Sequence, residues 1–439
     1  MRTSATPRVL VGCADVGGFV TDLADGFRRN GCPTTIAITQ PNGWIPPRPG
    51  TVDCGDDARA VDWRAIGRSL LRGAMPPARR SACRTPAERI MWLLTHHDVF
   101  VFVHASLWHD DVTDMASAGA GREYALLKAL GKRIVSVFSG PDVRHPSAYD
   151  LQHARIGSAA WPMGDIRRTW RRIPFGYVLK NLRRAELHAD VILSQPNQAG
   201  LAVRPYHHLF APVDLDRYEY LVPRRDVPVV VHSASWPDIK GTTLINQTLQ
   251  RLRDSGVRFV WRDLGGVPNQ RLRREMTQAD VVIDQIHLPL HGKLGVEAMA
   301  SGCAVAACDR RAIEPFPADR PVWHIEPAVL EPQLRTLLTD RALRVRLAVE
   351  GRRYVSRYHR HDRIARSVLQ LLAGKASELP MHHPRFYASE YRLPMGGRIP
   401  RPLLQLTNDV LASRGVPAGT NVTALVERGL LAGGDARLM

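Results

Sequence analysis

Short apolar segments alternate with amphipathic segments along this 439-residue chain, and this alternation restricts the fold more than any other feature. Near the start, the apolar segment 7–12 is followed by a glycine turn at Gly17–Gly18, an amphipathic segment 19–30 and a second apolar segment 34–38. A strand, a helix and a strand in this order form a β-α-β unit, whose strands lie parallel. The sequence therefore predicts an α/β fold with helices on the faces of a parallel sheet.

The alternation runs through two separate stretches, which predicts two domains. Further apolar runs at 98–103, 133–138 and 190–194 extend the first sheet. A segment rich in proline and charge, 211–225, interrupts the pattern, which then restarts at 227. We expect a Rossmann-like domain at 1–215, a second Rossmann-like domain at 226–375 that is closed by a helix at 360–372, and a C-terminal extension at 376–439 with helical segments at 402–413 and 421–431. Two doubly wound sheets of this kind leave a cleft at the carboxyl ends of their strands, where such sheets bind ligands.

The composition narrows the class of protein. With 44% hydrophobic and 23% charged residues, the chain can form a packed interior. No apolar run approaches the roughly 20 residues that span a bilayer, and six cysteines without CxxC spacing indicate reduced, buried thiols. We expect a cytoplasmic protein. The formal net charge of +18 favours acidic partners such as nucleic acid, an anionic membrane or phosphorylated substrates.

The segment from His291 to Val305 carries the strongest sign of a ligand site. Gly292, Lys293 and Gly295 stand at the entry to a short helical segment, and Glu297 lies inside it. Free N–H groups and the positive end of a helix bind phosphate, and a nearby carboxylate can accept hydrogen bonds from a ribose. The alternative is a glycine-containing turn before an ordinary helix.

This segment resembles the nucleotide pocket of the group 1 (family 4) glycosyltransferases, which have the GT-B fold. The resemblance rests on Glu297-Ala298-Met299-Ala300 with Gly302 and Val305 after it. The segments Gly17–Gly18, Ile239-Lys240-Gly241 and 279–285 are similar to further motifs of that family, so the resemblance spans about residues 8–372. It implies two Rossmann-like domains facing a cleft and transfer of a sugar from a nucleoside-diphosphate-sugar to a saccharide or lipid-linked acceptor.

The resemblance also implies roles for particular residues. Lys240 and Gly241 would meet the donor diphosphate, and Glu297 would bind the ribose. The basic residue that the family has before its Lys-Gly turn is missing here, and our hypothesis is that Lys293 stands in for it as a second diphosphate cation. The other donor-binding positions would be Gly17, Gly18, Gly292, Leu294 and Gly295. His104, at the end of a first-domain strand, would be the catalytic residue beside the transferred sugar; a structural hydrogen-bonding role is the alternative.

Cations and helix-end N–H groups can stabilise the charge that develops on a leaving diphosphate. We therefore expect a site with no metal and no cofactor, and the resemblance implies retention at C1. Asp142 and Arg144 follow the predicted strand 133–138, so they would contact acceptor or donor, or pair with each other.

The sequence departs from the family at one catalytic position. The family carries a first glutamate eight positions before the second, and here Pro289 stands in that place. Two alternatives therefore stay open: a catalytically inactive relative that binds nucleotide or polyanion, and another GT-B enzyme such as a sugar-nucleotide epimerase.

The segment Arg167–Arg184 holds seven cations and no acid, with aromatic residues between them. Such a segment can lie on an anionic membrane, which suits a lipid-linked acceptor and peripheral contact with the inner face of the membrane. The alternative is a solvated helix face on which arginine stems pack. We expect no nucleic-acid partner, because no recognised nucleic-acid-binding module accompanies the charge.

Overall fold

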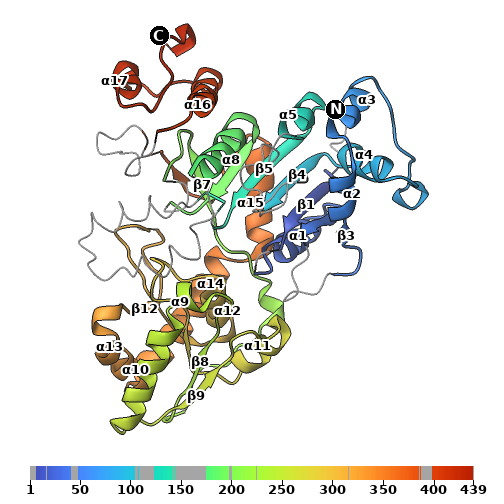
Figure 1. Ribbon diagram of the computed structural model, residues 1–439. Coiled ribbons are helices and arrows are strands. Elements are labelled where there is room, and N and C mark those ends of the chain that lie inside the picture. The colour runs from blue at the N-terminus through green and yellow to red at the C-terminus, as the bar shows by residue number, and fades with distance from the viewer. Residues whose placement is uncertain are drawn as a thin grey trace.

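The computed structural model describes residues 6–15, 17–40, 48–103, 107, 123–140, 142–143, 175–196, 200–223, 225–314, 316–384, 386 and 398–438. Within these residues the chain forms two α/β domains, each built around its own sheet, which stand one above the other in Figure 1. The predicted fold class, two doubly wound Rossmann-like domains, is confirmed.

The first sheet has the strand order β13-β7-β6-β5-β4-β1-β2-β3, with every neighbouring pair parallel except β13 and β7. The chain winds outward from β1 to β3 and then returns to place β4 on the other side of β1, which makes β1 and β4 the switch point of this sheet. The strands are β1 (Val9–Ala14), β2 (Thr34–Gln40), β3 (Val52–Asp53), β4 (Val99–Val103), β5 (Arg133–Phe138), β6 (Val191–Ser194), β7 (Tyr206–His208) and β13 (Met381–His382).

Helices cover both faces of this sheet because its strands are apolar on both sides. In β4, Val99, Val101 and Val103 face one core, and Phe100 and Phe102 face the other. The helices of this domain are α1 (Phe19–Arg29), α2 (Gly55–Ala60), α3 (Trp63–Leu71), α4 (Pro86–His96), α5 (Glu123–Ala129), α8 (Phe175–His188), α15 (His361–Leu372), α16 (Arg401–Arg414) and α17 (Val422–Glu427), with short 3₁₀ turns at Arg80–Ala82 and Ala436–Leu438.

The second sheet is parallel and has the order β12-β11-β10-β8-β9, so its switch point lies between β8 and β10. Its strands are β8 (Val229–His232), β9 (Val260–Asp263), β10 (Val281–Ile283), β11 (Ala304–Ala307) and β12 (Val322–His324). Its helices are α9 (Pro237–Lys240), α10 (Thr242–Asp254), α11 (Asn269–Met276), α12 (Lys293–Ser301), α13 (Leu330–Thr339) and α14 (Arg341–Tyr358), with 3₁₀ turns at Leu215–Arg217 and Pro327–Val329.

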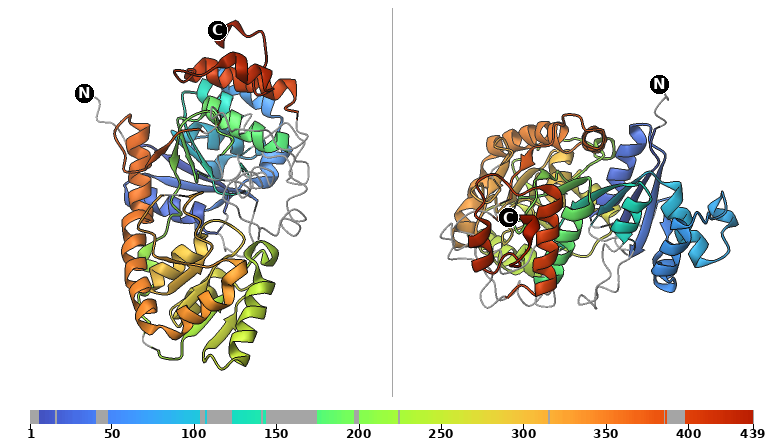
Figure 2. Two further views of the ribbon diagram at one scale, coloured as in Figure 1. Left: turned by 90° about the vertical axis from the view of Figure 1, so that its left-hand side faces the viewer. Right: turned by 90° about the horizontal axis from the view of Figure 1, so that it is seen from above.

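The helix expected to close the second domain packs on the first sheet instead. Its residues Ile364, Ala365 and Val368 join the core that contains β1 and α1, and α15 lies beside α1 (Figure 2). Apolar periodicity shows that a helix has a buried face, but it does not show which sheet that face covers. The second crossing of the chain between the domains is therefore at residues 359–361, directly before α15.

The first crossing of the chain between the domains, at Pro212 and Val213, runs beside the second. The Val213 N–H donates to the carbonyl of His359 (2.8 Å), and the His361 N–H donates to the carbonyl of Val213 (3.1 Å). The two covalent connections between the domains therefore form one hydrogen-bonded pair.

The C-terminal extension also belongs to the first domain. Helix α16 packs on α8, and β13 adds an edge strand next to β7. Beneath α16 the Arg183 guanidinium forms a buried ion pair with Glu186 (2.6 Å) and donates to the Thr407 hydroxyl (2.9 Å).

All six cysteines are buried free thiols, as expected. Among the described residues, no helix combines the length and apolar character that crossing a bilayer requires.

Candidate functional site

The predicted donor-binding residues follow strands that flank the two switch points. Gly17 and Gly18 lie between β1 and α1, Lys240 and Gly241 lie at the end of α9 after β8, and residues 292–297 begin α12 after β10. The carboxyl ends of strands beside a switch point are where open α/β sheets bind ligands. The structure therefore brings most of the predicted donor residues to the expected edges.

Asp284, the residue after β10, accepts hydrogen bonds at the start of α12. Its carboxylate accepts from the backbone N–H groups of Gly292 and Gly295 (3.2 Å) and from the Lys240 amine. Burial alone would raise the pKa of this carboxyl, but Lys240 and the Gly292 N–H outweigh burial and hold the pKa below its usual value. Asp284 had no predicted role. Its position directly after a buried apolar strand could have marked it as a residue of the ligand-binding edge.

Lys240 thus lies beside the entry to α12, and about one-sixth of its side chain is exposed (16%). An added Cβ on Gly292 would lie 3.2 Å from the Lys240 Nζ. The ammonium has three donors, and Asp284 is the acceptor found for one of them. Lys240 can therefore hold Asp284 and donate to a ligand at the same time.

Gly241 is required by its backbone and by close packing. Its φ is +78°, in the region that favours glycine, and a Cβ there would come within 2.3 Å of the Ile286 side chain. The Lys-Gly pair therefore has a structural reason for its glycine, in addition to the predicted contact with a diphosphate.

The glycine turn of the first domain is held by Asp15. Its buried carboxylate accepts from the Val20 N–H (2.9 Å) and the Thr21 hydroxyl (2.6 Å), and burial raises its pKa. A Cβ on Gly17 would lie 3.5 Å from Cγ of Lys293. The turn in the first domain and the start of α12 in the second are therefore in contact.

Lys293 begins α12 but its amine is directed to the first domain. The Nζ donates to Asp22 Oδ2 in α1 (2.6 Å) and to the carbonyl of Pro212, and it lies 5.6 Å from the centre of the Phe19 ring. Sequence analysis did not find Asp22, because nothing local links two residues that are 271 positions apart.

Glu297 lies one turn inside α12 and is buried. Asn269 donates to its Oε2 (3.5 Å), and the Tyr218 hydroxyl is also hydrogen-bonded to it. Burial raises the pKa of Glu297 to about 7, which Asp22 reinforces and Lys293 partly offsets. Leu294, beside it, packs its side chain into the core, so only its backbone can face a ligand.

The remaining predicted site residues are His104, Asp142 and Arg144. His104 and Arg144 lie outside the described residues. Asp142 is buried and accepts from the N–H groups of Gly140 (2.8 Å) and Ser139 (3.3 Å), so it holds the turn after β5.

The basic segment Arg167–Arg184 is described only from residue 175. In that half Arg183 is buried in its ion pair with Glu186 and does not face solvent. Contact of the segment with a membrane stays a prediction.

The fold of this chain is similar to the folds of solved structures of other proteins. No protein-family profile matches the sequence, and no curated protein matches it. Among solved structures, sucrose-phosphate synthase from Thermosynechococcus elongatus is similar over 84% of this chain and 99% of that one, with 13% identity and a TM-score of 0.50. At this identity the likeness supports the two-domain GT-B fold and no more.

Two further solved structures have lower scores. The catalytic domain of starch synthase IV from Arabidopsis thaliana, bound to ADP and acarbose, is 12% identical over 84% of this chain and 99% of that one, with a TM-score of 0.48. WaaG, a glycosyltransferase involved in lipopolysaccharide biosynthesis, is 13% identical over the same shares, with a TM-score of 0.46.

Proposed function

We propose that this chain is a glycosyltransferase that moves a sugar from a nucleoside-diphosphate-sugar to a saccharide or lipid-linked acceptor. The observation that carries the proposal is the convergence of Gly17, Lys240 and the start of α12, with Glu297 one turn inside that helix. The likeness to sucrose-phosphate synthase supports the two-domain GT-B fold that the proposal requires.

In this function the second domain binds the donor. Lys240 donates to the diphosphate, and the first-turn N–H groups of Lys293 and Leu294 add to it, because they have no partner within the helix. Glu297 accepts hydrogen bonds from the ribose. Gly17 and Gly18 let the backbone of the first domain approach the sugar.

The reaction forms a bond from the acceptor oxygen to C1 and breaks the bond from C1 to the phosphate oxygen, whose electron pair stays on the diphosphate. Lys240 and the positive end of α12 stabilise that charge, so the proposal needs no metal. Retention at C1 and the catalytic role of His104 come from the family resemblance and are part of the same proposal.

A second candidate is an inactive relative that binds nucleotide without transferring a sugar. Two observations favour it: Pro289 stands where the family has its first glutamate, and both lysines are paired with carboxylates of the chain itself.

A thermal-shift panel with UDP, GDP, ADP, TDP and CDP tests nucleotide binding. We expect one nucleotide to stabilise the wild type and to lose this effect in Glu297→Ala. Glu331→Ala removes a partly exposed glutamate of α13 that pairs with Arg251; this variant is the matched control and should keep the effect. No shift with any nucleotide would refute the donor site.

Lys240→Ala and a turnover assay separate the remaining possibilities. The variant should weaken binding of the diphosphate more than that of the matching monophosphate; equal losses would place Lys240 away from the diphosphate. An active enzyme should release nucleoside diphosphate slowly from its nucleotide-sugar even without acceptor, and the inactive relative should not.

A further inference from the structure

The amine of Lys293 is nearly buried between the domains, although its backbone belongs to the second. Its side chain is 10% exposed and that of Asp22, its partner in α1, is 6% exposed. The Pro212 carbonyl, from the first crossing, and the Phe19 ring of α1 complete its surroundings. The partners found for this ammonium therefore lie in the first domain and in the crossing that leaves it.

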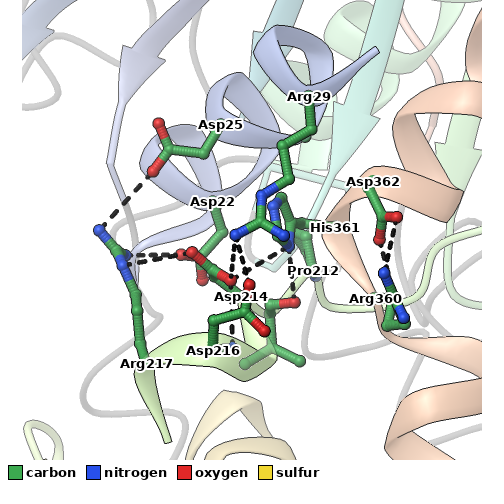
Figure 3. Close-up of polar contacts among 12 residues, drawn as sticks. Asp22, Asp25, Arg29, Pro212, Asp214, Asp216, Arg217, Arg360, His361 and Asp362 are labelled. Carbon is green, nitrogen blue, oxygen red and sulfur yellow. Dashed lines mark hydrogen bonds and ion pairs between the residues drawn. The ribbon is translucent and has the colours of Figure 1, made fainter.

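Asp22 is held from a second side. Arg217, in the 3₁₀ turn after the first crossing, donates to its Oδ1 (3.0 Å), as Figure 3 shows. Next to this pair Arg29 of α1 reaches Asp216 (2.6 Å) and Asp214 (3.4 Å) of the same turn (Figure 3). The polar face of α1 is therefore joined by ion pairs to the crossing and to the start of α12.

This geometry bears on what Lys293 can do for a bound donor. The amine already donates to two acceptors, Asp22 and the Pro212 carbonyl, so only one of its three donors is left for a diphosphate. Lys240 is more exposed and meets its carboxylate within its own domain. Of the two lysines, Lys240 is the better diphosphate ligand and Lys293 the better link between domains.

We propose that Lys293 and Asp22 form an interdomain tie, in which Lys293 is a positioning residue for sugar transfer and not the second diphosphate cation. The tie holds the start of α12 against the glycine turn of the first domain, whose Gly17 lies against the Lys293 stem. The tie thereby fixes the position of the start of α12, where the donor diphosphate would bind, relative to the Gly17–Gly18 turn, which would face the sugar. This inference rests on the proposed function.

The test uses the full chain with Asp22→Asn, Lys293→Met and the double variant. Asp25→Asn is the matched control, since Asp25 is one turn along α1 and also faces Arg217 (3.6 Å) but does not contact Lys293. Lys293→Arg keeps the charge and guards against variants that fail to fold. For each we would measure affinity for the five nucleoside diphosphates, release of nucleoside diphosphate from UDP-glucose, GDP-mannose and ADP-glucose, and the radius of gyration by small-angle X-ray scattering.

We expect Asp22→Asn and Lys293→Met each to lower turnover at least tenfold and to enlarge the radius of gyration, while nucleotide affinity changes less than threefold. The double variant should be no slower than the slower single variant, because both remove the same interaction. Asp25→Asn should stay within threefold of the wild type in turnover, and Lys293→Arg, which keeps the charge, should lose less turnover than Lys293→Met.

Two results would overturn the tie. One is a tenfold loss of diphosphate affinity in Lys293→Met with normal affinity in Asp22→Asn, which would make Lys293 a diphosphate cation. The other is wild-type turnover and scattering in both single variants. If the wild type binds no nucleotide, the proposed function is wrong, and the scattering of the two variants still decides whether the tie exists.

Discussion

If Glu297 binds the ribose as proposed, we expect nucleotide binding to depend on pH in the neutral range. Its carboxyl is buried, and burial raises its pKa to about 7. The charged groups that face it are Lys293, Asp22 and Arg273, and burial raises the pKa of the Tyr218 hydroxyl well above its ordinary value. The pKa of Glu297 itself lies inside the neutral range.

The size of the effect follows from this pKa. About one-tenth of Glu297 is ionised at pH 6 and about nine-tenths at pH 8. Ribose hydroxyls donate to the carboxylate more strongly than to the carboxylic acid. We therefore expect affinity for the donor to rise about tenfold between pH 6 and pH 8, or about 1.4 kcal/mol.

Stability of the free protein should change in the opposite direction. Since the folded pKa lies above the unfolded value, the folded state binds more protons between pH 4.5 and pH 7, and the free energy of unfolding falls as pH rises through this window. The rise of the Glu297 pKa from 4.5 to about 7 corresponds to a change of about 3 kcal/mol in the free energy of unfolding.

Isothermal titration calorimetry with a nucleotide-sugar measures the affinity, since a free terminal phosphate itself titrates near pH 6. Urea unfolding measures the stability, and Glu297→Gln is the control that should flatten both trends. Affinity of the wild type that is equal at pH 6 and pH 8, or a slope that survives in Glu297→Gln, would refute the reasoning.

Three further predictions concern the packing and stability of the folded protein. Arg183→Leu leaves Glu186 buried without its cation, so urea unfolding should show a loss of about 3–5 kcal/mol, whereas removing the exposed cation Arg437 should change the free energy of unfolding far less. Gly26→Ala places a Cβ 2.3 Å from the His361 carbonyl oxygen, so calorimetry should show a lower Tm through a loss of about 1–3 kcal/mol; an unchanged Tm would contradict the α1–α15 contact. Because burial raises the pKa of all six thiols, a thiol reagent should label them slowly in the native protein and fully in urea; rapid native labelling would contradict their burial.

Many of the helices and strands could be predicted, because each depends on the local pattern of apolar and polar residues. The apolar run at 98–103 became β4, and the amphipathic segment 19–30 became α1. Period and length identify such elements wherever they occur in the chain. The placement of α15 could not be predicted, since two sheets offered the same kind of apolar surface.

The candidate site, too, could be predicted only where it depends on local sequence. Spacing alone pointed to Glu297 and the glycine turns, and the family resemblance pointed to Lys240, because each belongs to a short motif; their roles stay predictions. It could not show that Asp284 and Asp22 pair with the two lysines, since ion pairs depend on how distant segments meet. These two carboxylates change the expected electrostatics, because they pair with the positive charge of both lysines before any ligand arrives.

The paired crossings at Val213 and His359 affect the order in which the chain can fold during synthesis. The second domain is one continuous stretch between them, whereas the first needs α15, β13 and α16 from the far end of the chain. An N-terminal domain normally folds first as it leaves the ribosome. Here the inserted second domain should finish folding while the first still awaits α15, β13 and α16, so the first domain stays exposed to chaperones until those segments have been synthesised.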